Sequence, residues 1–89
     1  MQINYTAKFI RQYSKLDFDL KKELKEKVNL FLDIRNHKQL KIHKLHGKLK
    51  SVYGFSINYK IRIVFKYLSK QEAVFFWLLA IMMFINSIF

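Results

Sequence analysis

The second half of the chain concentrates the residues whose side chains could bind or cleave a polyanion. Residues 34–71 contain ten Lys or Arg residues and all three histidines, His37, His43 and His46, but no Asp or Glu. A stretch with one sign of charge creates a positive field that nothing nearby neutralises, so a phosphate-rich or strongly acidic partner is expected. An imidazole titrates near neutral pH and can also serve as a general acid or base. The alternative is a basic surface that binds no polyanion.

The first third of the chain has mixed charge and a helical spacing of its apolar residues. Residues 2–5 alternate in polarity, which predicts a short strand. Thr6 and Asp17 are suited to cap two successive helices, and apolar residues at helical spacing follow each cap. Because the connection between them is short, we expect an antiparallel helix hairpin, followed by a loop over residues 33–40. The apolar positions are Phe9, Ile10, Tyr13 and Leu16 in the first helix and Leu20, Leu24, Val28 and Phe31 in the second.

After Gly47 the spacing of the apolar residues changes to two, which predicts antiparallel strands. Turns at residues 58–60 and 69–70 divide these strands, and a last strand begins near Glu72. The expected architecture is α+β, with the order β-α-α-β-β-β and a helix hairpin packed on one face of an antiparallel-rich sheet. The positions expected to face the helices are Leu49, Tyr53, Phe55, Ile57, Ile61, Ile63, Phe65 and Tyr67. We expect function on the opposite face, which would carry Lys48, Lys50, Arg62 and Lys66.

The composition excludes several classes of protein. The 89 residues are enough for one domain only, spanning 1–89, and the apolar share of 52% excludes a disordered basic tail. Without cysteine the chain can form no disulfide and no zinc–thiolate site, and three histidines with one acidic residue after Asp33 argue against any metal. Residues 1–13 contain no secretory signal, so a cytoplasmic location is expected.

The end of the chain is unusually apolar. Residues 73–85 are thirteen consecutive apolar residues. A last strand accounts for about seven of them, given the usual strand lengths, and a membrane-spanning helix needs about 20. We therefore expect no membrane association, and a small membrane protein anchored through residues 73–89 is an alternative that depends on this segment alone.

Three runs in the second half of the chain carry a resemblance to a known family. They are HKLHGKLK at 43–50, YGFSI at 53–57 and YKIRIVF at 59–65. With the opening YTAKF at 5–9 and the helix pair, they resemble the RelE/ParE toxin superfamily, and more narrowly its RelE/StbE, YafQ-like branch. The resemblance covers roughly residues 2–76.

The resemblance implies both a fold and an activity. Members share a β-α-α-β-β-β core and are toxins of type II toxin–antitoxin systems. RelE-like members cut mRNA in the ribosomal A site without a metal or cofactor, whereas ParE-like members poison DNA gyrase. The implied partners are therefore mRNA on the ribosome and an acidic, partly disordered antitoxin that covers the basic face.

The resemblance also points to site residues. Cleavage by an attacking 2′-hydroxyl needs a base, an acid and a cation for the charge of the transition state. Arg62 matches the family's arginine, whose guanidinium can fork onto phosphate oxygens. His43 matches the histidine of the HxLxG run and could serve as base or acid. Their alternative roles are a surface ion pair for Arg62 and a loop cap for His43. The expected RNA-binding residues are Lys44, His46, Lys48, Lys50, Lys60 and Lys66, whose alternative is a plain solvated edge.

The sequence departs from the family pattern at two places. Gly54 and Ser56 stand nearest to where RelE carries a pair of lysines, and the polar ending IGxHDxYK is replaced by LAIMMFIN at residues 79–86. Met has one codon, so Met82–Met83 read one base earlier must contain an aspartate codon. The shifted frame as a whole can spell LAIGNHDVYK. Our hypothesis is a one-base frameshift near residues 75–76 that produced the apolar tail.

Two functions from different classes follow. The leading interpretation is a RelE-like mRNA interferase whose activity the altered ending is expected to impair. The alternative is a non-enzymatic protein, either a ParE-like gyrase poison or an inactive toxin that still binds its antitoxin. Cleavage of ribosome-bound mRNA distinguishes the first from the second.

Overall fold

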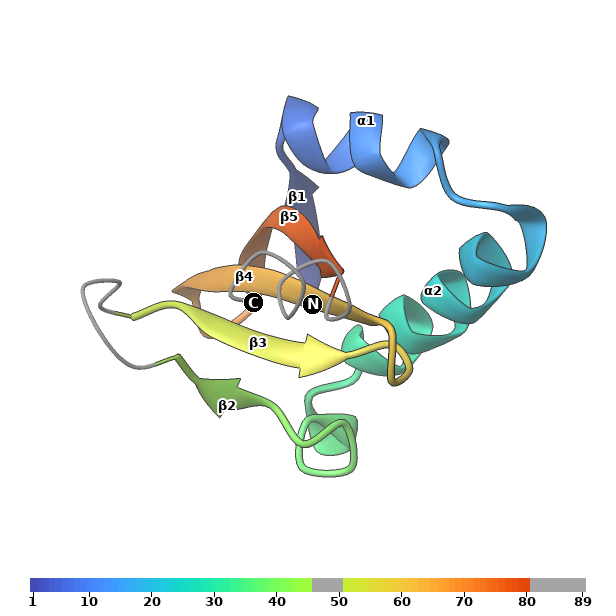
Figure 1. Ribbon diagram of the computed structural model, residues 1–89. Helices are drawn as coiled ribbons and strands as arrows, with labels where there is room; N and C mark the ends of the chain where they lie inside the picture. Colours follow the sequence, from blue (N-terminus) through green and yellow to red (C-terminus); the bar gives the residue numbers. More distant parts are fainter. Residues whose placement is uncertain (46–50, 81–89) are drawn as a thin grey trace.

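A computed structural model describes residues 1–45 and 51–80 (Figure 1). Its first strand is followed by two α-helices, a short 3₁₀ helix and four more strands. The elements are β1 (Gln2–Tyr5), α1 (Ala7–Ser14), α2 (Phe18–Phe31), the 3₁₀ helix η1 (Ile34–Asn36), β2 (His43–Lys44), β3 (Tyr53–Ser56), β4 (Ile61–Ser69) and β5 (Glu72–Ala80). The predicted α+β class, with two helices packed on a sheet, is confirmed.

The five strands form one mixed sheet in the order β1-β5-β4-β3-β2. β1 pairs parallel with β5, and each other neighbouring pair is antiparallel. The sheet has one strand more than predicted, because His43 and Lys44 pair with β3. A two-residue strand is too short to leave a period in the sequence. Leu49, which was expected in this region of the sheet, lies outside the described residues.

The core lies between the sheet and the two helices, and phenylalanine dominates it. Phe31 of α2 is fully buried, stacks on Phe55 with 5.5 Å between ring centroids, and meets Phe65 and Phe75 edge-on at 5.0 and 5.1 Å. Aromatic pairs at such distances add about 0.5–1.5 kcal/mol each beyond the burial of their area. The residues of β3 and β4 that were expected to face the helices do so: Tyr53, Phe55, Ile57, Ile61, Ile63, Phe65 and Tyr67 all belong to or pack against this core.

Side-chain caps begin both helices, as predicted. The Thr6 hydroxyl accepts from the Phe9 amide at 3.1 Å, and the Asp17 carboxylate accepts from the Leu20 amide at 2.8 Å. Such caps contribute about 1 kcal/mol each. The two helices do not close on each other, because an apolar groove of about 340 Å³ opens between them.

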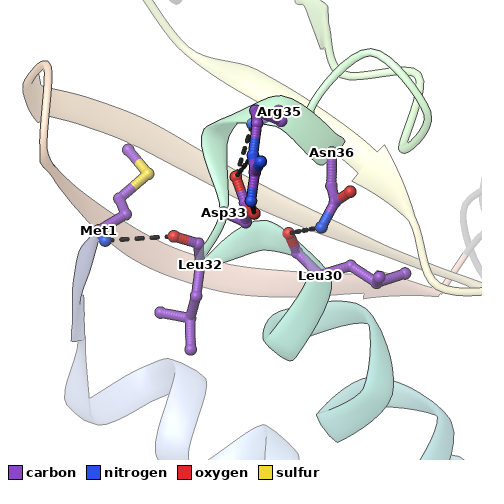
Figure 2. Close-up of polar contacts among 6 residues, drawn as sticks. All are labelled: Met1, Leu30, Leu32, Asp33, Arg35 and Asn36. Atoms are coloured by element: carbon purple, nitrogen blue, oxygen red, sulfur yellow. Dashed lines mark hydrogen bonds and ion pairs between the residues drawn. The ribbon is translucent and has the colours of Figure 1, made fainter.

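Polar contacts hold the end of α2 and the turn after it (Figure 2). The Asn36 side-chain amide donates to the Leu30 carbonyl at 3.0 Å, and the Met1 main-chain nitrogen donates to the Leu32 carbonyl at 3.1 Å. The Arg35 guanidinium forks onto Asp33, and these hydrogen bonds hold the pKa of that carboxyl at about 2. The predicted loop over 33–40 is therefore an ordered turn that contains η1.

β5 extends beyond its partner β1, and α1 covers the exposed part of its edge. The Gln12 side chain accepts from the Leu78 amide at 2.7 Å and donates to the Leu78 carbonyl at 3.0 Å. The Thr6 hydroxyl donates to the Phe76 carbonyl in the same way. Because buried main-chain groups need partners, these side chains explain how β5 continues to Ala80. The strand thus contains eight residues of the apolar run, one more than expected.

Within the described ranges, no helix is long and apolar enough to span a membrane. The part of the apolar tail from residue 81 onward, on which the frameshift hypothesis and the membrane alternative mainly depend, lies outside these ranges.

Candidate functional site

The face of the sheet that points away from the helices brings together three of the predicted site residues. Arg62 and Lys66 alternate along β4 with residues of the core, so they point to the opposite side. Arg62 pairs with Ser56 of β3, and Gly54 of β3 pairs with His43 of β2. Residues opposite each other in a sheet share a face. We call this surface, defined by His43, Ser56, Arg62 and Lys66, the open face, because it points away from the helices. Its centre is not exposed, since Val64, between Arg62 and Lys66 on β4, is 1% exposed.

Gly54, which has no side chain, leaves room for the Arg62 side chain on the open face. A Cβ atom at residue 54 would lie 3.4 Å from Cδ of Arg62 and 3.3 Å from the Ile63 carbonyl oxygen. The Arg62 side chain therefore leans across β3, toward the strand that carries His43. Opposite Cα atoms in antiparallel strands are about 4.5–5.5 Å apart, so Cδ of Arg62 lies within about 10 Å of the His43 Cα. A guanidinium and an imidazole can reach one phosphate group from such positions.

Within the described part of the chain, no carboxylate is paired with Arg62. The ion pair present there joins Asp33 and Arg35, at the end of α2. Nε of Arg62 is buried and has no hydrogen-bond partner among the described residues. A buried donor of this kind costs stability unless a ligand or a neighbour satisfies it. Arg62 therefore carries a donor that a bound anion could satisfy.

His43 is exposed, and its ring orientation is set by the main chain. Its Nδ1 lies 3.2 Å from the Lys41 carbonyl oxygen. Because a carbonyl only accepts, this contact places a proton on Nδ1 and leaves Nε2 of the neutral ring as a free acceptor. Lys41 itself has a φ of 57°, a left-handed conformation that lysine rarely adopts.

His37 is a structural residue. Its ring stacks on Phe31 at 4.4 Å, and Nε2 lies 2.7 Å from the Phe31 carbonyl oxygen. Its Nδ1 lies 2.8 Å from the Tyr67 hydroxyl. Because Nε2 donates to the Phe31 carbonyl, Nδ1 of the neutral ring accepts a hydrogen bond from the Tyr67 hydroxyl. Burial raises the pKa of Tyr67, so this hydroxyl stays protonated. Both ring nitrogens are occupied, and the ring lies on the helix side of the sheet.

Two further RNA-binding candidates that the structure describes, Lys44 and Lys60, do not lie on the open face. Lys44 pairs with Tyr53, whose side chain packs against the core, so Lys44 belongs to the helix side. Lys60 lies in the turn between β3 and β4, with its ammonium 5.6 Å from the Tyr59 ring centroid. His46, Lys48 and Lys50 lie outside the described residues.

A hollow at the edge of the open face contains residues that the sequence did not single out. Its volume is about 430 Å³, and two lysines, Lys27 of α2 and Lys41, contribute to its wall together with His43. We call it the edge hollow; its lining residues are Lys27, Gln39, Leu40, Lys41, His43 and Ser56. Lys41 belongs to the basic stretch and could have been suspected. Lys27 gave no signal, because it lies in a helix of mixed charge.

The described residues contain no group of three or more His, Asp or Glu side chains that could hold a metal ion. The charged and titratable groups on the open face are the guanidinium of Arg62, the imidazole of His43 and the ammonium group of Lys66. These groups bind phosphate, transfer protons and stabilise negative charge.

Comparison with solved structures places this architecture among known folds. The YoeB/ParE toxin from Agrobacterium tumefaciens superposes with a TM-score of 0.65 at 18% identity, covering 90% of this chain and 98% of that one. The chain has the fold of the RelE/ParE toxins. A chain of the E. coli DinJ–YafQ toxin–antitoxin complex gives 0.64 at 18% identity, with coverage of 89% and 90%. A chain of the archaeal RelE–RelB complex from Pyrococcus horikoshii gives 0.66 at 11%, with coverage of 89% and 92%.

No protein-family model matches the chain, and no curated protein matches it in sequence. The likeness is thus one of fold, and the fold expected from the RelE/ParE resemblance is confirmed.

Proposed function

We propose that the protein is the toxin of a type II toxin–antitoxin system and a RelE-like endoribonuclease that cuts mRNA on the ribosome. The observation that carries this proposal is the position of Arg62. Its side chain leans over Gly54 toward the strand of His43, and its buried Nε has no partner among the described residues. The solved structures with this fold include toxins from toxin–antitoxin complexes.

The proposed reaction uses the RNA's own 2′-hydroxyl as nucleophile. Nε2 of His43 takes the proton from this hydroxyl as the oxygen attacks the neighbouring phosphorus. The Arg62 guanidinium binds the non-bridging oxygens and stabilises the additional negative charge of the transition state. The bond from phosphorus to the 5′-oxygen breaks, and that oxygen takes a proton from water. The products are a 2′,3′-cyclic phosphate and a free 5′-hydroxyl.

Lys66 has a different part in this proposal. It lies four residues from Arg62 along β4, which corresponds to about 13 Å. It therefore cannot act on the same phosphate and instead binds a neighbouring one, which adds affinity without sequence preference. Each phosphate neutralised in this way makes RNA binding weaker as salt rises.

A non-enzymatic role is the second candidate, and one observation favours it. The lysine pair that RelE carries is absent, since Gly54 and Ser56 stand near those positions. The protein would then inhibit DNA gyrase, or bind its antitoxin without being toxic. In either role, an acidic segment of the antitoxin would bind the open face. Such a segment could supply a carboxylate for Arg62, which pairs with no described carboxylate of this chain.

The test is ribosome-dependent cleavage by the purified protein. Ribosomes carrying a defined mRNA are incubated with the full chain, and the RNA ends are mapped and tested for a 2′,3′-cyclic phosphate. New ends of this kind support the proposal. Intact mRNA together with inhibited DNA gyrase supports the second candidate instead.

The proposed toxin acts in the cytoplasm, where ribosomes are, and fractionation of cells expressing it checks this location. The frameshift hypothesis is tested separately by the nucleotide sequence. Codons for residues 77–86 that cannot spell LAIGNHDVYK in the shifted frame contradict it.

A further inference from the structure

We propose that the edge hollow is a ribonucleotide-binding pocket that selects the nucleotide beside the cleaved phosphodiester. This inference rests on the proposed function and adds a specificity site to it. The hollow joins the open face through His43 and Ser56, which belong to both. A nucleotide held there would lie next to Arg62, because Ser56 is the direct cross-strand partner of Arg62.

The hollow exists because the pairing of β2 with β3 stops early. The two strands pair at His43–Gly54 and Lys44–Tyr53. The same register, continued, would put Lys41 opposite Ser56. Lys41 instead has a φ of 57° and leaves the extended conformation, so no strand covers this end of β3. The edge hollow lies beside this end of β3, since Lys41 and Ser56 both line it.

Main-chain hydrogen bonds hold the loop that forms part of the wall of the hollow. The Leu40 amide donates to the Asn36 carbonyl at 3.0 Å, and the Lys41 amide donates to the Lys38 carbonyl at 3.1 Å. These hydrogen bonds hold the loop that carries Gln39 and Lys41. Left-handed backbone at a non-glycine residue is strained, and such strain is concentrated at ligand-binding positions.

The lining has the chemistry that a nucleotide requires. Lys27, Lys41 and His43 supply positive charge and hydrogen-bond donors for a phosphate, and no carboxylate lines the hollow. The Gln39 amide offers both a donor and an acceptor, which is what a base edge needs for recognition. Leu40, with 7% of its surface exposed, adds an apolar contact. The volume of about 430 Å³ lies within the range of small-ligand pockets.

The experiment is an NMR titration of the full chain, observed at the histidine ring protons. The probes are the four nucleoside 3′-monophosphates and, separately, inorganic phosphate. We expect the His43 signal to shift and saturate with at least one nucleotide, at a concentration about tenfold lower than with phosphate. The His37 ring, held by Phe31 and Tyr67 on the other side of the sheet, is the internal reference and should not shift.

Two variants and a control make the test specific. Lys27→Gln and Lys41→Gly should each weaken nucleotide binding about tenfold, because each removes a charge-assisted hydrogen bond. Lys22→Gln changes an exposed lysine of the same helix that does not line the hollow, and should leave the affinity within about twofold. Glycine accepts the left-handed conformation at residue 41, so Lys41→Gly keeps the fold.

The outcomes separate this inference from the proposed function. Equal binding of phosphate and nucleotides, an unshifted His43 signal, or unchanged affinity in both pocket variants overturns the nucleotide pocket. If mRNA is cleaved and the pocket variants cut the same sites as the unaltered chain, the pocket is wrong while the nuclease stands. If nucleotides shift His43 but no mRNA is cut, the pocket stands and the nuclease is wrong.

Discussion

Replacing Lys41 by glycine should stabilise the protein although it removes a side chain. The left-handed backbone at Lys41, with a φ of 57°, costs a residue with a Cβ about 1–2 kcal/mol. Glycine removes this cost but loses about 0.4–1 kcal/mol through its greater freedom in the unfolded chain. With the middle of each range, the difference is a gain of about 0.8 kcal/mol in the free energy of unfolding. For a domain of this size that corresponds to a rise of about 2–6 °C in Tm.

The assay is reversible urea unfolding followed by circular dichroism, with thermal unfolding as a second measurement. Lys38→Gly is the matched control, since Lys38 is an exposed lysine of the same loop. Among the described non-glycine residues only Lys41 and Ser51 have a positive φ, so Lys38 is not in the left-handed conformation. Without strain to relieve, the control should lose about 0.5–1 kcal/mol. Opposite signs in the two variants support the reasoning, whereas equal destabilisation of both refutes it.

Three further changes test the fold. Gln12→Ala should lower the free energy of unfolding by about 1–3 kcal/mol, because the amide and carbonyl of Leu78 both lose their partner. Urea unfolding measures this loss. A loss below about 0.3 kcal/mol contradicts the proposal that Gln12 covers the edge of β5. Phe31→Ala should lower the free energy of unfolding by about 3–5 kcal/mol, since it removes the centre of the aromatic core. A folded variant with an unchanged Tm contradicts this central role of Phe31. Arg35→Ala should raise the pKa of Asp33 from about 2 toward its ordinary value. Because the pKa of Asp33 is lowered in the folded state, the stabilisation from its pairing with Arg35 is present above about pH 4 and is lost toward pH 2. NMR titration of the carboxyl group measures the pKa of Asp33. An unchanged pKa in Arg35→Ala refutes the pairing.

Much of the fold could be predicted because its signals are local. Thr6 and Asp17 precede the helices that they cap, and the change of period after Gly47 gives the faces of β3 and β4 correctly. The parallel pairing of β1 with β5 is not local, since it joins Gln2 to Glu72. It follows from how the whole chain packs, and no pattern in either segment reveals it.

The candidate site could be predicted only in part, for the same physical reason. Arg62 is placed by the alternation of β4, and this much can be read from the sequence. Lys44 follows His43 directly, and since neighbouring residues of a strand point to opposite faces, only one of the two can join Arg62. The edge hollow depends on the backbone conformation of Lys41 and on the approach of Lys27 from α2, and composition indicates neither.

The central claim is that Arg62 stabilises the transition state of RNA cleavage on the open face. The most direct measurement is the single-turnover rate of mRNA cleavage on ribosomes by Arg62→Ala, with Arg35→Ala as control, because Arg35 is an exposed arginine paired with Asp33 away from the site. The account predicts a rate about 10²–10³-fold lower for Arg62→Ala and no comparable change for the control. A rate for Arg62→Ala within about threefold of the unaltered protein would contradict it.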